Sequence, residues 1–127
     1  MTLLLVDVAN TLGSRPDGWW RDRAGATARL LDRLALLPGR TTPGPDGTPL
    51  EVTALVAVVE GRARDVAAPA GVRLVRAPGS GDDALVQVAA ELAGEDLLAV
   101  TADRGLRARL PAGVRTCLLY TSDAADE

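Results

Sequence analysis

The sequence predicts an α/β fold in which helices cover both faces of a central parallel sheet. Short, uninterrupted apolar runs alternate along the chain with segments whose apolar residues recur at helical spacing. Runs of the first kind are typical of strands that are buried on both faces. Acidic residues follow several of these runs, at the strand ends where open α/β sheets place their ligands. Together these observations favour three layers, with parallel strands joined by right-handed crossovers.

The first half of the chain contains two expected strands, residues 3–7 (LLLVD) and 51–59 (EVTALVAVV). Between them, residues 19–37 carry Ala and Leu at helical spacing and predict a helix. Residues 11–18 and 38–50 are rich in Gly and Pro, which predicts a loop in each place and a surface position for the longer one.

The second half contains three further expected strands and two helices. The strands are residues 72–76, residues 97–100 and a segment that starts at Val114, whereas a helix is expected at residues 82–93 and a short one ending at Leu110. About five strands in the spatial order 3-2-1-4-5 would place the first and fourth strands side by side, at the topological switch point.

Carboxylates lie at the ends of these strands. Asp7 ends the first strand and Asp103 follows the fourth, while Glu60 ends the second and Asp82 and Asp83 open the helix after the third. Carboxylates about 5 Å apart repel each other by roughly 3 kcal/mol per pair at an effective dielectric of 20. They therefore take up protons or bind a cation. Because the chain has no His and a single Cys, such a site would hold a cation through oxygen, which favours Mg²⁺ or Mn²⁺.

Each acid also has a purely structural interpretation. Asp7 and Asp103 can serve as turn or cap residues, and Glu60 can be a solvated strand end. Asp82 or Asp83 can cap the helix that it opens, since Asp is favoured at that position. We expect one of the two to cap the helix and the other to bind metal. The agreement of all these acids on one edge of one sheet favours the metal site.

Three motifs resemble those of the NYN group of PIN-like ribonucleases. They are VDVAN (residues 6–10), GDDALV (residues 81–86) and VTADRGLRARL (residues 100–110). Members of that group carry a strand-end Asp followed three residues later by Asn, an acidic pair that opens a helix, and an Asp in a T/S-x-D turn. The resemblance implies a PIN-like fold and a Mg²⁺- or Mn²⁺-dependent nuclease that acts on RNA. The site residues that it implies are Asp7, Asn10, Asp82, Asp83 and Asp103.

Arginine and tryptophan side chains accompany the acidic segments. Arg binds phosphate in a bidentate manner, and Trp stacks on a base. A solvated surface role for the Arg residues, and packing of one Trp of Trp19-Trp20 under the first helix, are the alternatives. The residues expected to bind substrate are Asn10, Ser14, Arg15, Arg62 and Arg104.

Three functions remain open from the sequence. The first is an endoribonuclease in which Asp7, Asp83 and Asp103 are catalytic and, with Asp82, hold the metal, while Glu60 is a weaker candidate. The second is metal-dependent hydrolysis of a nucleotide or another small phosphate ester. The third is a non-catalytic module that binds RNA or a nucleotide, with structural acids.

Residues 1–116 are expected to form one domain, and residues 117–127 a non-native tail. The tail, CLLYTSDAADE, holds the only Cys and the only Tyr of the chain, and it resembles the translation of a sequencing adapter. On that interpretation the last part of the domain is missing; a genuine short acidic tail is the alternative. The chain lacks a basic segment before its first apolar run and any apolar run of roughly 18 residues. We therefore expect a cytoplasmic protein without a membrane span, and the oligomeric state, homodimer included, stays open.

Overall fold

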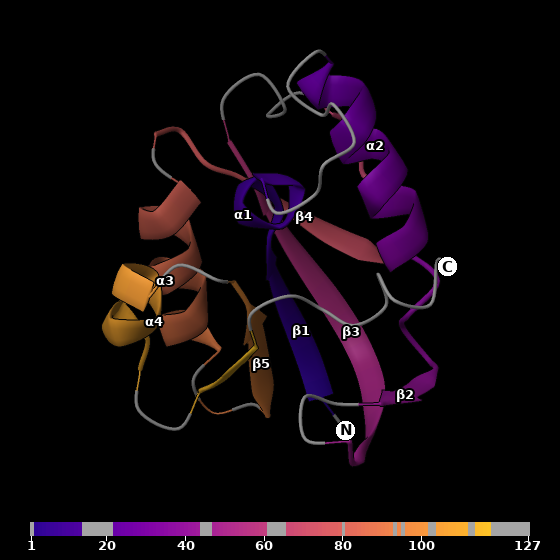
Figure 1. Cartoon of the computed structure of the whole chain (residues 1–127), viewed down its shortest axis with the longest axis vertical. Helices are drawn as coiled ribbons and strands as arrows, with labels where there is room; N and C mark the ends of the chain where they lie inside the picture. The colour runs from indigo at the N-terminus through magenta and orange to yellow at the C-terminus, as the bar shows by residue number, and fades with distance from the viewer. Residues whose placement is uncertain are drawn as a thin grey trace.

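A central sheet separates two layers of helices, as Figure 1 shows. The computed structural model describes residues 2–13, 22–43, 47–60, 66–79, 81–92, 94, 96–101, 104–111 and 114–117. The strands are β1 (Thr2–Asp7), β2 (Thr41–Pro43), β3 (Pro49–Val59), β4 (Val72–Arg76), β5 (Leu97–Val100) and β6 (Arg115–Cys117). The helices are α1 (Val8–Gly13), α2 (Arg23–Leu34), α3 (Gly81–Glu91) and α4 (Arg104–Arg109).

Five strands of the sheet run parallel in the order β4-β3-β1-β5-β6. This confirms the predicted order 3-2-1-4-5. β1 lies in the centre of the sheet, where Leu5 is paired with Val56 of β3 on one side and with Ala99 of β5 on the other. Because β1 and β5 are neighbours whose crossovers lead to opposite faces, their carboxyl ends form the switch point.

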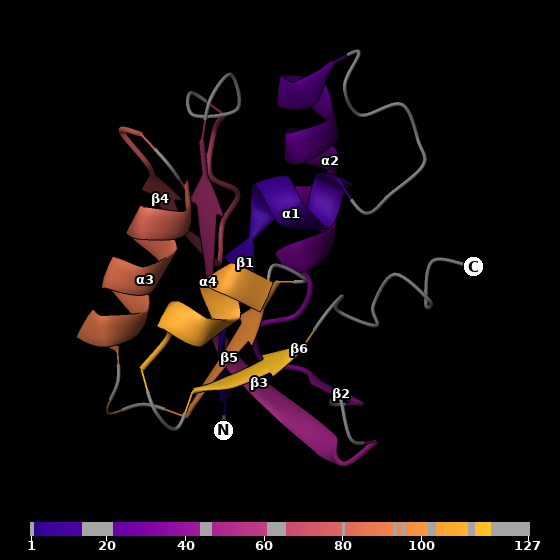
Figure 2. The ribbon, with the colours of Figure 1, turned by 60° about the vertical axis from the view of Figure 1, so that its left-hand side comes forward.

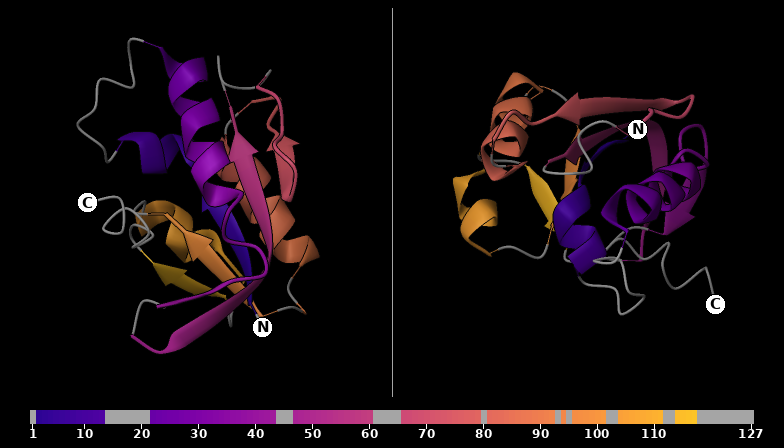
Figure 3. Two further views of the ribbon diagram at one scale, coloured as in Figure 1. Left: turned by 90° about the vertical axis from the view of Figure 1, so that its right-hand side faces the viewer. Right: turned by 90° about the horizontal axis from the view of Figure 1, so that it is seen from above.

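Alternate residues of the central strands enter two separate cores. Leu4 and Val6 lie on the face that α2 covers, in one cluster with Leu31 of that helix. Leu5 packs on the opposite face with Leu85 of α3 and with side chains of α4. Figure 3 shows these layers from the side and from above. Burial on both faces explains why the strand sequences are continuous apolar runs.

The predicted loop at residues 38–50 is wrong in part. Residues Thr41–Pro43 form β2, which pairs antiparallel with the start of β3, and β3 itself begins at Pro49. Gly47, with φ of +83°, lies between the two strands. This antiparallel pairing involves only three residue pairs, one of which is Pro43 with Pro49. Such a short segment has no apolar pattern that would predict a strand, so the sequence shows only its Pro and Gly residues, which are typical of a turn.

The predicted loop at residues 11–18 is also wrong in its first part, because α1 continues to Gly13. The long N-terminal helix begins at Arg23, later than expected, with Asp22 as its cap: the Asp22 carboxylate accepts the Gly25 N–H at 3.0 Å. Residues 14–21 and 118–127 lie outside the described residues, so the boundary at residue 117 stays a prediction. No helix in the described ranges is long and apolar enough to cross a bilayer.

Candidate functional site

The carboxyl edge of the sheet brings together residues from four segments of the chain. Asp7 ends β1, Glu60 follows β3, Thr101 follows β5, and Asp82 lies in the first turn of α3. In Figure 2 this edge is the upper one, where α1 leaves β1. The parallel order of the strands is what gathers these residues, which are up to 94 positions apart in sequence.

Asp7 is the most deeply buried carboxylate of the described residues, with 5% of the residue exposed. Its Oδ1 accepts the backbone N–H of Asn10 at 3.3 Å, and its Oδ2 accepts the hydroxyl of Thr101 at 3.2 Å. Thr11 donates its hydroxyl to the Asp7 carbonyl at 2.9 Å, which fixes the start of α1 on the end of β1. Asp7 is therefore held from two elements while its carboxylate stays at the strand end.

Burial raises the pKa of Asp7 from 3.8 to about 6. The hydrogen bonds from Asn10 and Thr101 lower that pKa, but the negative charges of Asp82 and Glu60 raise it further. Desolvation and like charge both disfavour the ionised form. No Arg among the described residues lowers the pKa of Asp7, and a bound cation would supply the positive charge that balances it.

The two acids of the GDDALV motif lie in different surroundings. Asp82 is half-buried, and its charge acts on Asp7. Asp83 is exposed and forms an ion pair with Arg109 of α4 at 2.7 Å, with 72% of the Asp83 side chain and 49% of the Arg109 side chain accessible. Of the pair, Asp82 is thus the acid that is electrostatically coupled to Asp7.

Glu60 contacts the same helix from the neighbouring strand. Its Oε2 accepts the backbone N–H of Gly81, the first residue of α3. The sequence predicts that one of the two aspartates of α3 caps this helix, whereas in the structure a carboxylate from the end of β3 binds its first amide.

Thr101 is a site residue that the sequence reasoning missed. It is fully buried, it directly follows β5, and its hydroxyl donates to the Asp7 carboxylate. The sequence does contain a signal, since Thr101 stands two positions before Asp103 in the T/S-x-D turn, but a turn role alone does not predict this contact. A buried hydroxyl beside a strand-end carboxylate is better understood as a group that orients it.

Of the other predicted site residues, the structure describes Asn10 and the backbone of Arg104. Asn10 is half-buried in α1, where its backbone contacts Asp7. Arg104 is the first residue of α4, but its side chain lies outside the described part of the structure. The other predicted site residues that are not described are Ser14, Arg15, Arg62 and Asp103, together with the pair Trp19-Trp20.

The described residues supply two acidic oxygen donors at this end of the sheet, Asp7 and Asp82. No group of three candidate ligands occurs among the described His, Cys, Asp and Glu residues. Carboxylate oxygens of this kind are the donors that a hard cation such as Mg²⁺ or Mn²⁺ prefers. A third donor would have to come from outside the described ranges, and Asp103, which follows Thr101 by two positions, is the predicted one.

The fold is similar to that of Rae1 (YacP) from Bacillus subtilis. A crystal structure of a variant of that protein aligns with a TM-score of 0.62 and 17% sequence identity, covering 91% of this chain and 69% of that chain. No protein-family model matches the sequence, and no curated protein matches it. At this identity the likeness concerns the fold, and it agrees with the PIN-like fold that the motifs predict.

Proposed function

We propose that this chain is a divalent-metal-dependent endoribonuclease that hydrolyses RNA phosphodiester bonds at the carboxyl edge of its sheet. The observation that carries the proposal is the Asp7 carboxylate, which is buried at the switch point with two acidic neighbours and a pKa of about 6. A buried charge without a partner is costly. A carboxylate whose pKa is raised by burial and by neighbouring acids is therefore a candidate functional group.

The structural alternative for Asp7 is a helix cap, and it explains less. The Asn10 N–H bond at 3.3 Å is long for such a cap. Ser, Thr or Asn would accept the same bond without a buried charge. The contact from Thr101, which follows β5, adds nothing to a cap but does fix the carboxylate in place.

The residues divide into three roles in this proposal. Asp7, Asp82 and Asp103 hold the ion, and Thr101 orients Asp7. We favour Asp82 over Asp83 because the charge of Asp82 acts on Asp7, whereas Asp83 pairs with Arg109. A bound divalent ion supplies Lewis acidity, which lowers the pKa of a water ligand and offsets charge on a phosphodiester. The residues proposed to bind the RNA backbone are Asn10, Ser14, Arg15, Arg62 and Arg104.

The test compares the Asp7→Asn variant with Asp32→Asn, a matched change at an exposed position of α2. Mn²⁺-dependent cleavage of a labelled single-stranded RNA should fall by about 100-fold or more in Asp7→Asn, as expected for loss of a ligand in metal-ion catalysis. Asp32→Asn should cleave like the wild type, and circular dichroism should show that both variants are folded.

Other outcomes would assign one of the alternative functions. Turnover of free nucleotides without RNA cleavage would show a nucleotide hydrolase. RNA binding without Mn²⁺ binding in titration calorimetry would show a non-catalytic module. Wild-type rates in Asp7→Asn would remove the nuclease proposal altogether.

A further inference from the structure

We infer that Glu60 is a positioning residue, which holds the first turn of α3 so that Asp82 faces Asp7, and that it is not itself a ligand of the ion. The inference rests on the proposed function, because it concerns the same site. In this role Glu60 places Asp82 through a hydrogen bond to the backbone of Gly81, the residue before it.

The contact between Glu60 and Gly81 joins the end of β3 to the start of α3. β3 lies beside β1, with Val58 paired to Asp7, so Glu60 follows β3 at the same end of the sheet as Asp7. From there, Glu60 Oε2 accepts the Gly81 N–H. The first amides of a helix have no partner within the helix, and they carry the positive end of its dipole. A carboxylate is therefore a strong acceptor at this place.

Gly81 is shaped to that carboxylate. It is buried, and a Cβ atom at this position would lie 2.9 Å from Glu60 Oε2 and 3.0 Å from Glu60 Cδ. A side chain at residue 81 would therefore require the Glu60 carboxylate to move. Because Asp82 is the next residue, the hydrogen bond at Gly81 fixes the backbone from which Asp82 extends.

Two roles for Glu60 lead to different expectations. As a ligand it would act through its charge, and a neutral amide could not replace it. As a positioning residue it acts through one acceptor oxygen, which Gln also provides. The bond to Gly81 gives a reason for an acceptor oxygen at residue 60 that does not involve an ion.

The experiment uses three variants and one matched control in the full chain. Glu60→Gln keeps an acceptor, Glu60→Ala removes it, and Gly81→Ala keeps every carboxylate but displaces that of Glu60. The control, Glu91→Gln, makes the same chemical change at an exposed position in the last turn of α3. Mn²⁺ affinity is measured by calorimetry, and kcat and KM are measured on RNA.

We expect Glu60→Ala and Gly81→Ala to weaken Mn²⁺ binding by about tenfold or more, as is common when a group that orients a ligand is lost. Glu60→Gln and Glu91→Gln should stay within about threefold of the wild type on the same scale. Equal losses in Glu60→Gln and Glu60→Ala would identify Glu60 as a ligand and overturn the inference. Wild-type affinity in Gly81→Ala would overturn it as well.

A measurement without metal separates this inference from the proposed function. Hydrogen exchange of the backbone amide of residue 81, followed by NMR and compared with the intrinsic rate of that residue type, should be faster in Glu60→Ala and Gly81→Ala and unchanged in Glu60→Gln. Unchanged exchange in Glu60→Ala would overturn the inference whatever the protein does to RNA. The variants could show these exchange effects while the wild type neither binds Mn²⁺ nor cleaves RNA. That result would overturn the nuclease proposal, and with it the role of the Glu60–Gly81 contact in metal binding.

Discussion

At the scale of single residues, Asp7 is expected to weaken the metal-free fold. Its folded-state pKa of about 6 lies above the value of 3.8 for an ordinary Asp. Folding therefore favours the protonated form of the side chain. The stability that Asp7 contributes is fully present below about pH 4 and is lost as the pH rises to about 6. A shift of about two units corresponds to about 3 kcal/mol, which is an upper value for this loss.

Asp7→Asn should thus stabilise the metal-free protein at neutral pH. The amide avoids the buried charge but offers one acceptor instead of two, so the Asn10 or the Thr101 bond is lost, at about 1 kcal/mol. We expect a net gain of about 2 kcal/mol at about pH 7.5 and none, or a small loss, at about pH 4.5. Urea denaturation of both proteins in EDTA measures the difference.

The same comparison with Mn²⁺ present supplies the control. An ion that binds only the folded wild type stabilises it by mass action, so the advantage of Asp7→Asn should shrink or reverse. A variant that is destabilised equally at both pH values in EDTA would contradict the account, because Asp7 would then act only through its hydrogen bonds.

At the scale of elements, α3 presents two adjacent carboxylates to different partners. Asp82→Asn should reduce Mn²⁺-dependent cleavage by about tenfold or more. Asp83→Asn and Arg109→Ala should change it by less than about threefold and should cost less than about 1 kcal/mol of stability, because an exposed ion pair contributes little. Cleavage rates and thermal unfolding of the three variants test this. Equal losses of cleavage in Asp82→Asn and Asp83→Asn would show that both acids serve the site.

The choice between these two acids shows how far the sequence leads. The uninterrupted apolar runs predict the strands, and right-handed crossovers predict their order, so the position of Asp7 at the switch point follows from the sequence. Which of Asp82 and Asp83 faces Asp7 depends on the rotation of α3. Arg109, 26 positions after Asp83, and Glu60, 21 positions before Gly81, both bind that helix. Contacts of this kind leave no periodic signal in a single sequence.

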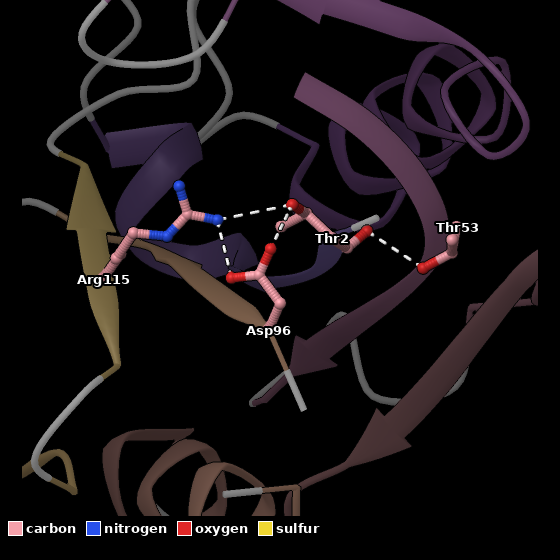
Figure 4. Close-up of polar contacts among 4 residues, drawn as sticks. All are labelled: Thr2, Thr53, Asp96 and Arg115. Carbon is pink, nitrogen blue, oxygen red and sulfur yellow. Dashed lines mark hydrogen bonds and ion pairs between the residues drawn. The ribbon is translucent and has the colours of Figure 1, made fainter. Parts of the chain in front are cut away.

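At the scale of the whole molecule, the amino and carboxyl ends of the parallel strands, here called the amino edge and the carboxyl edge, differ in how their charges are balanced. At the amino edge, Thr2 donates its hydroxyl to Asp96 Oδ2 at 2.8 Å, and Arg115 binds Asp96 Oδ1 at 2.8 Å and the Thr2 hydroxyl at 3.3 Å (Figure 4). The Thr2 carbonyl accepts the hydroxyl of Thr53, so the cluster joins β1, β3 and β6 to the residue before β5. Every charge in this cluster has a partner, whereas Asp7 at the carboxyl edge has none of opposite sign among the described residues.

This contrast predicts that Arg115→Ala affects stability but not activity. The hydrogen bond from Thr2 and the charge of Arg115 hold the pKa of Asp96 below its usual range. The stabilisation is therefore present above about pH 4 and is lost as the pH falls through that lowered pKa. Because both side chains of the ion pair are about half exposed, we expect a loss of about 1 kcal/mol or less. Hydrogen exchange should increase first in β6, a three-residue edge strand.

The matched control is Arg73→Ala, which removes an exposed Arg from β4 at the other side of the sheet. Urea denaturation, exchange at β6 and Mn²⁺-dependent cleavage are measured for both variants. Faster exchange in Arg115→Ala with wild-type cleavage would mean that the balanced edge stabilises the sheet while the unbalanced edge serves the reaction. A loss of cleavage as large as that in Asp82→Asn would contradict this division, because the two ends of β1 and β5 would then depend on each other through the length of those strands.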